Sequence, residues 1–107
     1  MIEYIYIFTR QDMSPEQQLV QSAHATLVLG NKLRGRKDVS NIYFTVIGVP
    51  NLLELGHVMK TLTSQKKGFI TFYEPDMGNT LTSIATYPIP ADERGKLKDY
   101  KLLRFPK

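Results

Sequence analysis

The chain lacks cysteine and tryptophan altogether, and it has no long uninterrupted run of apolar residues. The lack of cysteine excludes a disulfide framework, a zinc site built on thiolates and a thiol nucleophile. The two histidines, His24 and His57, are 33 residues apart and do not by themselves make a metal site. A membrane-spanning helix needs about 20 mostly apolar residues in a row, which this sequence does not contain. Because the acidic Glu3 stands where a signal peptide has a basic start, we expect a cytoplasmic protein.

What remains is the composition of a small, basic α/β domain. The 107 residues suit a single domain, placed over 1–107, and 42% of them are hydrophobic, which is enough for a core. Lysine and arginine outnumber the acidic residues, and the net charge is +4. The excess lies in residues 94–107 and in a second cluster of Lys32, Arg34, Arg36 and Lys37. These segments are either solvated surface or a site for a phosphate-bearing ligand, and composition leaves both open.

Alternating strand and helix signals predict the order β-α-β-α-β-β followed by a short C-terminal element. We expect strands at 3–10, 41–49, 69–73 and 81–87, and helices that begin after Ser14 and Asn51. The strand at 41–49 is apolar nearly throughout, which is typical of a central strand. The tail from Ala91 is expected to hold a short basic helix, after which residues 102–105 pack back on the sheet. The predicted architecture is a mixed four-stranded sheet with flanking helices.

Both helices begin with a recognisable cap. Ser14 is followed by Pro15 and by Gln17 at the third helical position, and Asn51 is followed by Glu54 at the same spacing. The first helix is expected to run to about residue 33 and to bury an apolar face made of Leu19, Val20, Ala23, Leu27 and Gly30.

Two polar stretches are expected to meet at one edge of the sheet. In open α/β sheets, ligands bind at the carboxyl ends of the strands. The first strand ends at Arg10 and Asp12 and leads into the helix that carries Gln17, Gln21 and His24. The third strand ends near Glu74, and after it come Asp76, Gly78, Asn79, Thr80 and Thr82. If the first and third strands are close in the sheet, these groups converge.

Each of these residues also has a purely structural explanation. Gln17 can serve the helix cap, and His24 can be a hydrogen-bonded packing residue. Asp76 favours a turn, and the threonines are common in strands. Tyr73 and Tyr87 are candidates for base stacking, with a core or surface role as the alternative.

The two stretches resemble the motifs of the type II peptidyl-tRNA hydrolases. The first motif of that family is a strand ending in Arg-x-Asp, followed by a helix with Lys-x-x-x-Gln-x-x-His-Ala; here it is matched by Arg10 to Asp12 and by Gln17 to Ala25. The second motif, Asp-Ala-Gly-x-Thr, is matched by Asp76 to Thr80. The resemblance implies the hydrolase fold along nearly the whole chain. If the chain also has the activity of this family, the resemblance implies that it cleaves the ester between peptide and tRNA, with Asp76, His24 and Thr80 as catalytic candidates.

One charged residue of the family motif is missing. The family's lysine falls on Gln17, and a neutral amide does not replace a cation. The Pro-Gly-Ser stretch that the family has after its second motif is also absent. A polar pocket without that charge is better suited to holding a ligand than to cleaving one. In this respect the chain resembles phage proteins that reuse the hydrolase fold as sponges for the cyclic oligonucleotide signals of bacterial anti-phage (CBASS) immunity, such as cyclic GMP–AMP.

This second resemblance implies sequestration without turnover. The pocket is expected to be completed in a homo-oligomer, a dimer or a tetramer, with no cofactor, metal or membrane involved; tRNA is a partner only if the protein is a hydrolase. The implied ligand-binding residues are Arg10, Gln17, Gln21, His24, Asp76, Asn79, Thr80 and Thr82. Arg10 would meet a phosphate, and the amides and Asp76 would read base edges. A third interpretation is a general RNA-binding or interaction module that uses the basic tail and the loop at 34–37, but a net charge of +4 argues against a large nucleic-acid footprint.

Overall fold

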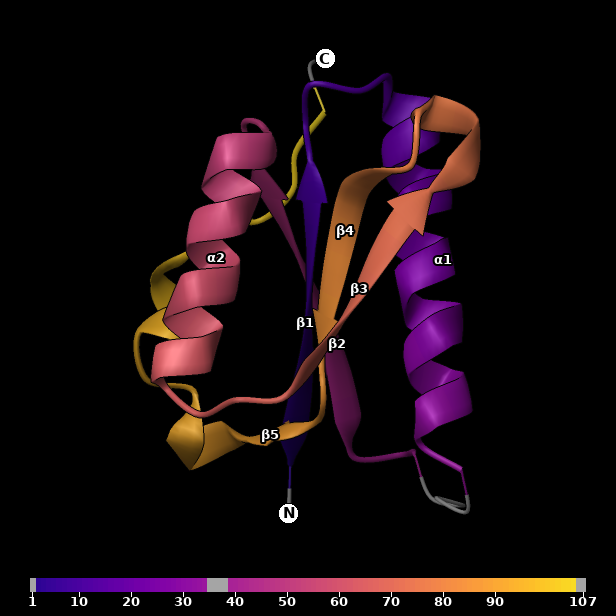
Figure 1. The fold of residues 1–107 in the computed structure, drawn as a ribbon. Coiled ribbons are helices and arrows are strands. Elements are labelled where there is room, and N and C mark those ends of the chain that lie inside the picture. Colours follow the sequence, from indigo (N-terminus) through magenta and orange to yellow (C-terminus); the bar gives the residue numbers. More distant parts are fainter. Residues whose placement is uncertain (1, 35–38, 106–107) are drawn as a thin grey trace.

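The sheet is built around β1, Glu3–Arg10, which has neighbours on both sides (Figure 1). The computed structural model describes residues 2–34 and 39–105, and there the sheet has five strands in the order β2-β1-β4-β3, with β5 paired to the amino-terminal end of β1. The other strands are β2 Ile42–Val49, β3 Phe69–Glu74, β4 Thr80–Thr86 and β5 Ile89–Pro90. An α/β domain with a mixed sheet is thus confirmed, and the two-residue β5 is added to the four predicted strands. Two members of the predicted basic cluster, Arg36 and Lys37, lie outside the described residues.

Three strands end at the same edge of the sheet. β2 is parallel to β1, whereas β4 is antiparallel to both β1 and β3. The strands β1, β2 and β3 therefore run in one direction, and we call the side where they end the carboxyl edge, at the top of Figure 1. The first and third strands are not neighbours, because β4 lies between them. Their ends nevertheless flank the start of β4, so the two polar stretches meet there.

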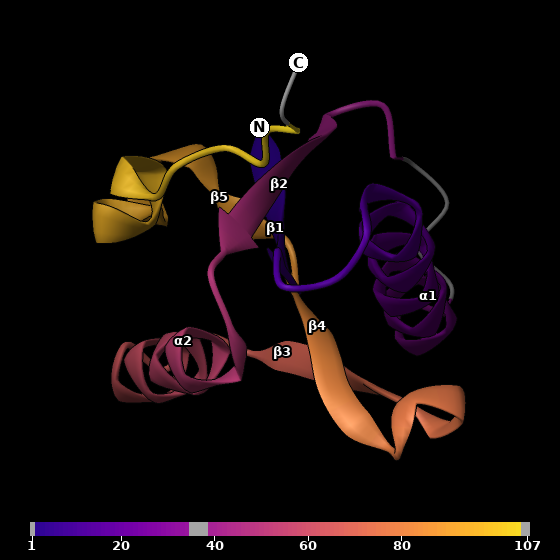
Figure 2. The same cartoon turned by 90° about the horizontal axis from the view of Figure 1, so that it is seen from above.

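Helices cover both faces of the sheet. Helix α1, Pro15–Lys32, lies on one face, and α2, Leu52–Ser64, lies on the other together with the C-terminal segment (Figure 2). That segment contains two short 3₁₀ helices, η2 Ala91–Glu93 and η3 Gly95–Asp99; the second carries Lys96 and Lys98 and lies where a short basic helix was predicted. Both predicted caps are confirmed, since the side chains of Ser14 and Asn51 accept hydrogen bonds from backbone N–H groups three residues on, at 3.2 and 3.0 Å.

Alternation along β1 divides the core into two clusters. Tyr6 and Phe8 pack on the α2 side, and Ile5 and Ile7 pack on the α1 side. All four side chains are at most 3% exposed. Burial on both faces explains why this strand reads as a continuous apolar run.

The buried face of α1 is not the predicted one. Leu19, Val20 and Leu27 are 58%, 49% and 74% exposed, and Ala23 and Gly30 are exposed as well. The residues of α1 that are buried are Gln18, Gln21, Ala25 and Leu29.

Hydrogen bonding explains this reversal. The Gln18 amide is 4% exposed and donates to the carbonyl of Met13 at 2.7 Å. A buried amide costs little when its hydrogen bonds are made, so two glutamines occupy positions that periodicity assigns to apolar residues. The prediction was wrong because it ranked residues by hydrophobicity and could not see these partners.

The prediction of a central position for the strand at 41–49 was also wrong. β2 is an edge strand, with Tyr43 49% and Phe44 55% exposed. Its apolar character is explained in part by the C-terminal segment, which packs back as predicted and forms a bridge between Leu102 and Ile47 on the outer edge.

Residues 100–105, here named the C-terminal strap, are held to the sheet by hydrogen bonds. The Leu103 N–H donates to the Val46 carbonyl at 2.8 Å, and the Gln11 side chain donates to the Arg104 carbonyl at 2.9 Å. The Gln11 side chain crosses directly over Gly48, where an added Cβ would overlap its amide oxygen. Glycine at this position therefore leaves the space that Gln11 needs to hold the strap.

We predict that Gly48→Ala displaces the Gln11 side chain and costs about 1 kcal/mol, the net value of a typical hydrogen bond. Gln11→Ala should have a similar cost, and the double variant should cost no more than Gln11→Ala alone, because both changes remove the same contact. Chemical denaturation measures all three free energies of unfolding. Gly56→Ala in α2, where an added Cβ meets nothing within 4 Å, is the matched control and should not destabilise the protein. Additive costs in the double variant would contradict this role for Gly48.

Candidate functional site

Gln21 joins α1 to β3 and β4 at the carboxyl edge. Its side-chain N–H donates to Glu74 Oε2 at 3.0 Å, and its Oε1 accepts from the Thr82 hydroxyl at 3.1 Å. Its backbone carbonyl accepts from the Ser83 hydroxyl at 2.8 Å. Gln21 is 4% exposed and Thr82 is fully buried, so both predicted ligand residues lie beneath the surface. They form the floor of the site and do not line its opening.

Glu74 is the residue of this floor that the sequence analysis did not select. It ends β3, is 8% exposed, and accepts from Gln21 and, through Oε1, from the Asp76 backbone N–H at 3.1 Å. These two hydrogen bonds, the one from Gln21 first, hold the pKa of Glu74 below its ordinary value of 4.5 although burial opposes them. The sequence marked Glu74 only by its place at the end of a strand. Its contact with Gln21 could not be predicted, because the two residues are 53 positions apart.

His24 lies one helical turn after Gln21 and faces the same carboxylate. Its Nδ1 is 3.5 Å from Glu74 Oε2 and is buried, with no hydrogen-bond partner among the described residues. The ring meets Phe72 edge-on, with 4.7 Å between the ring centroids. Because the side chain as a whole is 42% exposed, the exposed part of the ring is the side that carries Nε2. Glu74 and Phe72 thus orient an imidazole whose outer nitrogen is available.

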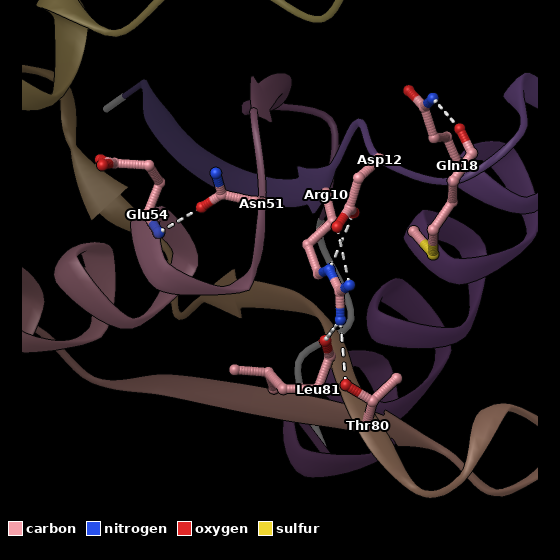
Figure 3. A network of polar contacts seen from close by, with 8 residues as sticks. Arg10, Asp12, Gln18, Asn51, Glu54, Thr80 and Leu81 are labelled. Atoms are coloured by element: carbon pink, nitrogen blue, oxygen red, sulfur yellow. Dashed lines mark hydrogen bonds and ion pairs between the residues drawn. The ribbon is translucent and has the colours of Figure 1, made fainter.

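Arg10 is committed to internal contacts, as Figure 3 shows. Its Nε and Nη2 donate to the two carboxylate oxygens of Asp12 at 2.9 and 2.8 Å. Its Nη1 donates to the Thr80 hydroxyl and to the Leu81 carbonyl, both at 2.9 Å. The paired guanidinium lowers the pKa of Asp12. The bidentate edge that we expected to meet a phosphate is therefore occupied by a carboxylate.

Three predicted residues form an exposed rim around the floor. Gln17, Asp76 and Asn79 are exposed, and in the described part of the chain their side chains make no hydrogen bond. Asp76 lies in the turn η1, Pro75–Met77, which is the structural role that the sequence also allowed for it, and Asn79 follows with a φ of 59°. Their side chains remain free to bind a ligand.

The predicted stacking residues lie at opposite ends of the sheet. Tyr73 is 46% exposed and directly precedes Glu74 at the carboxyl edge. Tyr87 follows β4 at the other end, packed against Gly68. Tyr73 is thus the one of the two that lies at this edge, where it is paired with Leu81 of the cluster on the α2 side.

A basic groove opens beside Arg10 on the same edge. It has a volume of about 750 Å³ and is lined by Gln11, Gly48, Pro50, Lys101, Leu102 and Arg104. Both cations are exposed and belong to the C-terminal strap. Sequence reasoning saw these charges only as part of a basic tail, because their approach to β1 and β2 depends on the path of the strap.

The side chains of the carboxyl edge can exchange hydrogen bonds and protons. In residues 2–34 and 39–105, no group of three or more His, Asp and Glu side chains is placed to hold a metal ion. Among the helices described there, none has the length and apolar character needed to cross a bilayer. The chemistry available is the reading of polar groups by amides and carboxylates, together with the imidazole of His24.

We predict that Gln21→Leu destabilises the fold by about 1–3 kcal/mol, because Glu74 Oε2 loses its donor and the buried Thr82 hydroxyl keeps only the 3.3 Å contact with the Phe72 carbonyl. Gln17→Leu is the matched control, since Gln17 is exposed on the same helix and the change should stay within about 0.5 kcal/mol. Chemical denaturation of both variants measures the difference. Equal stabilities would show that the Gln21 contacts do not hold the site together.

Glu74 should make stability depend on pH in the acidic range. A carboxyl whose pKa is lower in the folded state stabilises the fold above its unfolded pKa, and this contribution is lost as the pH falls through the folded value. The free energy of unfolding should therefore decrease below pH 4.5, the ordinary pKa of Glu74. Glu74→Gln should reduce that dependence in denaturation curves collected across the acidic range. An unchanged pH profile would contradict the assignment.

The carboxyl edge thus combines a hydrogen-bonded floor with a rim of free polar groups and a basic groove. No protein-family model matches the chain, and no match is found among curated proteins. The function is therefore inferred from the side chains of this edge.

Proposed function

We propose that the protein binds a cyclic oligonucleotide, such as a cyclic dinucleotide of anti-phage immunity, and sequesters it without turnover. The observation that carries this proposal is the pairing of Arg10 with Asp12. Among the described residues, Arg10 is the one arginine or lysine whose side chain hydrogen-bonds to a predicted site residue, Thr80. Its positive charge is neutralised by the carboxylate of Asp12. Ester hydrolysis builds an oxyanion that needs preorganised positive charge or donors, and Gln17 supplies no cation in place of the family's lysine. The edge is better equipped for binding than for cleavage.

The two parts of the edge suit the two parts of a nucleotide. The rim of Gln17, Asp76 and Asn79 offers amide and carboxylate groups that pair with base edges. The rim and floor carry more acid than base, so they do not suit phosphates. Lys101 and Arg104 in the neighbouring groove provide the cations that phosphates require. Resemblance to the phage sponges supports the cyclic ligand, and a homo-oligomer that completes the pocket remains part of the proposal.

The second candidate is peptidyl-tRNA hydrolase activity, which one observation favours. The carboxylate of Glu74 lies 3.5 Å from His24 Nδ1, and such an orienting carboxylate suits a general base acting through Nε2. Thr80, a catalytic candidate from the sequence, instead accepts a hydrogen bond from Arg10.

Calorimetric titration with cyclic dinucleotides and trinucleotides tests the proposal. The wild-type protein should bind at least one of them, and intact ligand should return to solution after heat denaturation. His24→Ala should weaken binding about tenfold or more, the effect of losing roughly 1.4 kcal/mol of contact. His57→Ala is the matched control, because His57 is also 3.5 Å from a glutamate but lies on α2.

Failure to bind any cyclic oligonucleotide would overturn sequestration, as would recovery of a cleaved ligand. An equal loss in both histidine variants would remove the site from this edge. Cleavage of peptidyl-tRNA by substoichiometric protein, abolished in His24→Ala alone, would establish the second candidate instead.

A further inference from the structure

The exposed face of α1 carries an apolar stripe with a regular spacing. Its members recur at intervals of four and three residues, and all are exposed: Glu16, Val20, Ala23, Leu27, Gly30 and Arg34. The first five lie within α1, and Arg34 follows just after its end. Such spacing places side chains along one side of a helix, here the side opposite the buried glutamines. Leu19, 58% exposed, borders the stripe. Within the described residues nothing covers it.

The stripe is complementary to itself when one copy is reversed. Reversal about residue 25 places Ala23 opposite Leu27 and Val20 opposite Gly30, so that each large side chain meets a small one. An added Cβ at Gly30 would meet nothing within 4 Å, so the space beside it is open to receive a side chain. The same reversal places Glu16 opposite Arg34, an acid opposite a base.

We propose that a second copy of this chain docks on α1, with the two helices antiparallel about a two-fold axis near residue 25. The symmetry is isologous, so each contact occurs twice: two Glu16–Arg34 pairs at the ends and two Leu27–Ala23 contacts near the centre. Antiparallel packing also sets the positive end of each helix dipole beside the negative end of the other. This inference specifies the homo-oligomer of the proposed function, but it rests on the stripe of α1 and is tested without a nucleotide.

The charge pattern favours a protein partner over a lipid surface. A helix that binds membranes carries several cations along its polar face. The one lysine or arginine within α1 is Lys32 in its last turn, and the face of the helix opposite the stripe packs on the sheet. A second copy places a small side chain opposite each large one and an opposite charge at each end of the stripe, whereas a bilayer does neither.

A second copy in this position would border the candidate site. Gln17 and His24 lie two turns apart on the flank of α1 between the stripe and β3. Val20 of the stripe lies at the height of the turn between them. The partner helix therefore passes beside the exposed part of the His24 ring, and each site would have a wall from the other copy.

Sedimentation velocity over micromolar to millimolar concentrations tests the dimer. The wild-type protein should dimerise, and Leu27→Glu should weaken association at least about tenfold, since a charge would be buried against apolar side chains. Leu27 is 74% exposed, so circular dichroism and thermal melting should show an unchanged fold. Leu53→Glu is the matched control, because Leu53 is a 68% exposed leucine on the other helix.

A charge exchange tests the register of the two helices. Glu16→Arg and Arg34→Glu should each weaken the dimer, because each places like charges opposite one another, and the double variant should restore it. A monomer at all concentrations would overturn the proposal. If that monomer also floats with phosphatidylcholine–phosphatidylglycerol vesicles in a gradient, the stripe binds a membrane and not a second copy. A dimer that is insensitive to Leu27→Glu, or equally sensitive to Leu53→Glu, would also overturn it, and lack of recovery in the double variant would overturn the antiparallel register.

Discussion

The buried amide of Gln21 is the contact on which the carboxyl edge depends. It joins a helix to the end of one strand and to the start of its neighbour through hydrogen bonds to Glu74 and Thr82. An unpaired polar group at this depth is costly, so the three side chains fix one another. The position of His24 follows, because its ring rests between Phe72 and the carboxylate that Gln21 holds.

The parts of the fold that local sequence determines were predictable. Ser14 and Asn51 mark the starts of both helices, and the apolar run of β1 marks a strand buried on both faces. The meeting of the two polar stretches was also predictable, because the carboxyl ends of parallel strands share an edge.

The remaining features depend on contacts between residues far apart in the chain. Glu74 enters the site through a partner 53 residues away, and Arg10 donates to Thr80 and to the Leu81 carbonyl, 70 and 71 residues away. Periodicity located an apolar stripe on α1 correctly but assigned it to the core. Hydrophobicity alone does not say which side of a helix meets the sheet when glutamines on the other side find hydrogen-bond partners. The misassigned stripe is the surface that we propose as a dimer interface.

The C-terminal strap covers part of the outer edge of β2. An edge strand with unpaired backbone groups is a template for pairing with other chains, and β2 exposes Tyr43 and Phe44 as well. The strap occupies part of that edge through Leu103 and is fastened by Gln11 to the start of α1. Loss of the fastening would open the carbonyl of Val46 to a foreign strand. Pairing of foreign strands with β2 is thereby opposed by the strap, of whose contacts one depends on a side chain lying over a glycine, whereas α1 is the surface that we propose for ordered self-association.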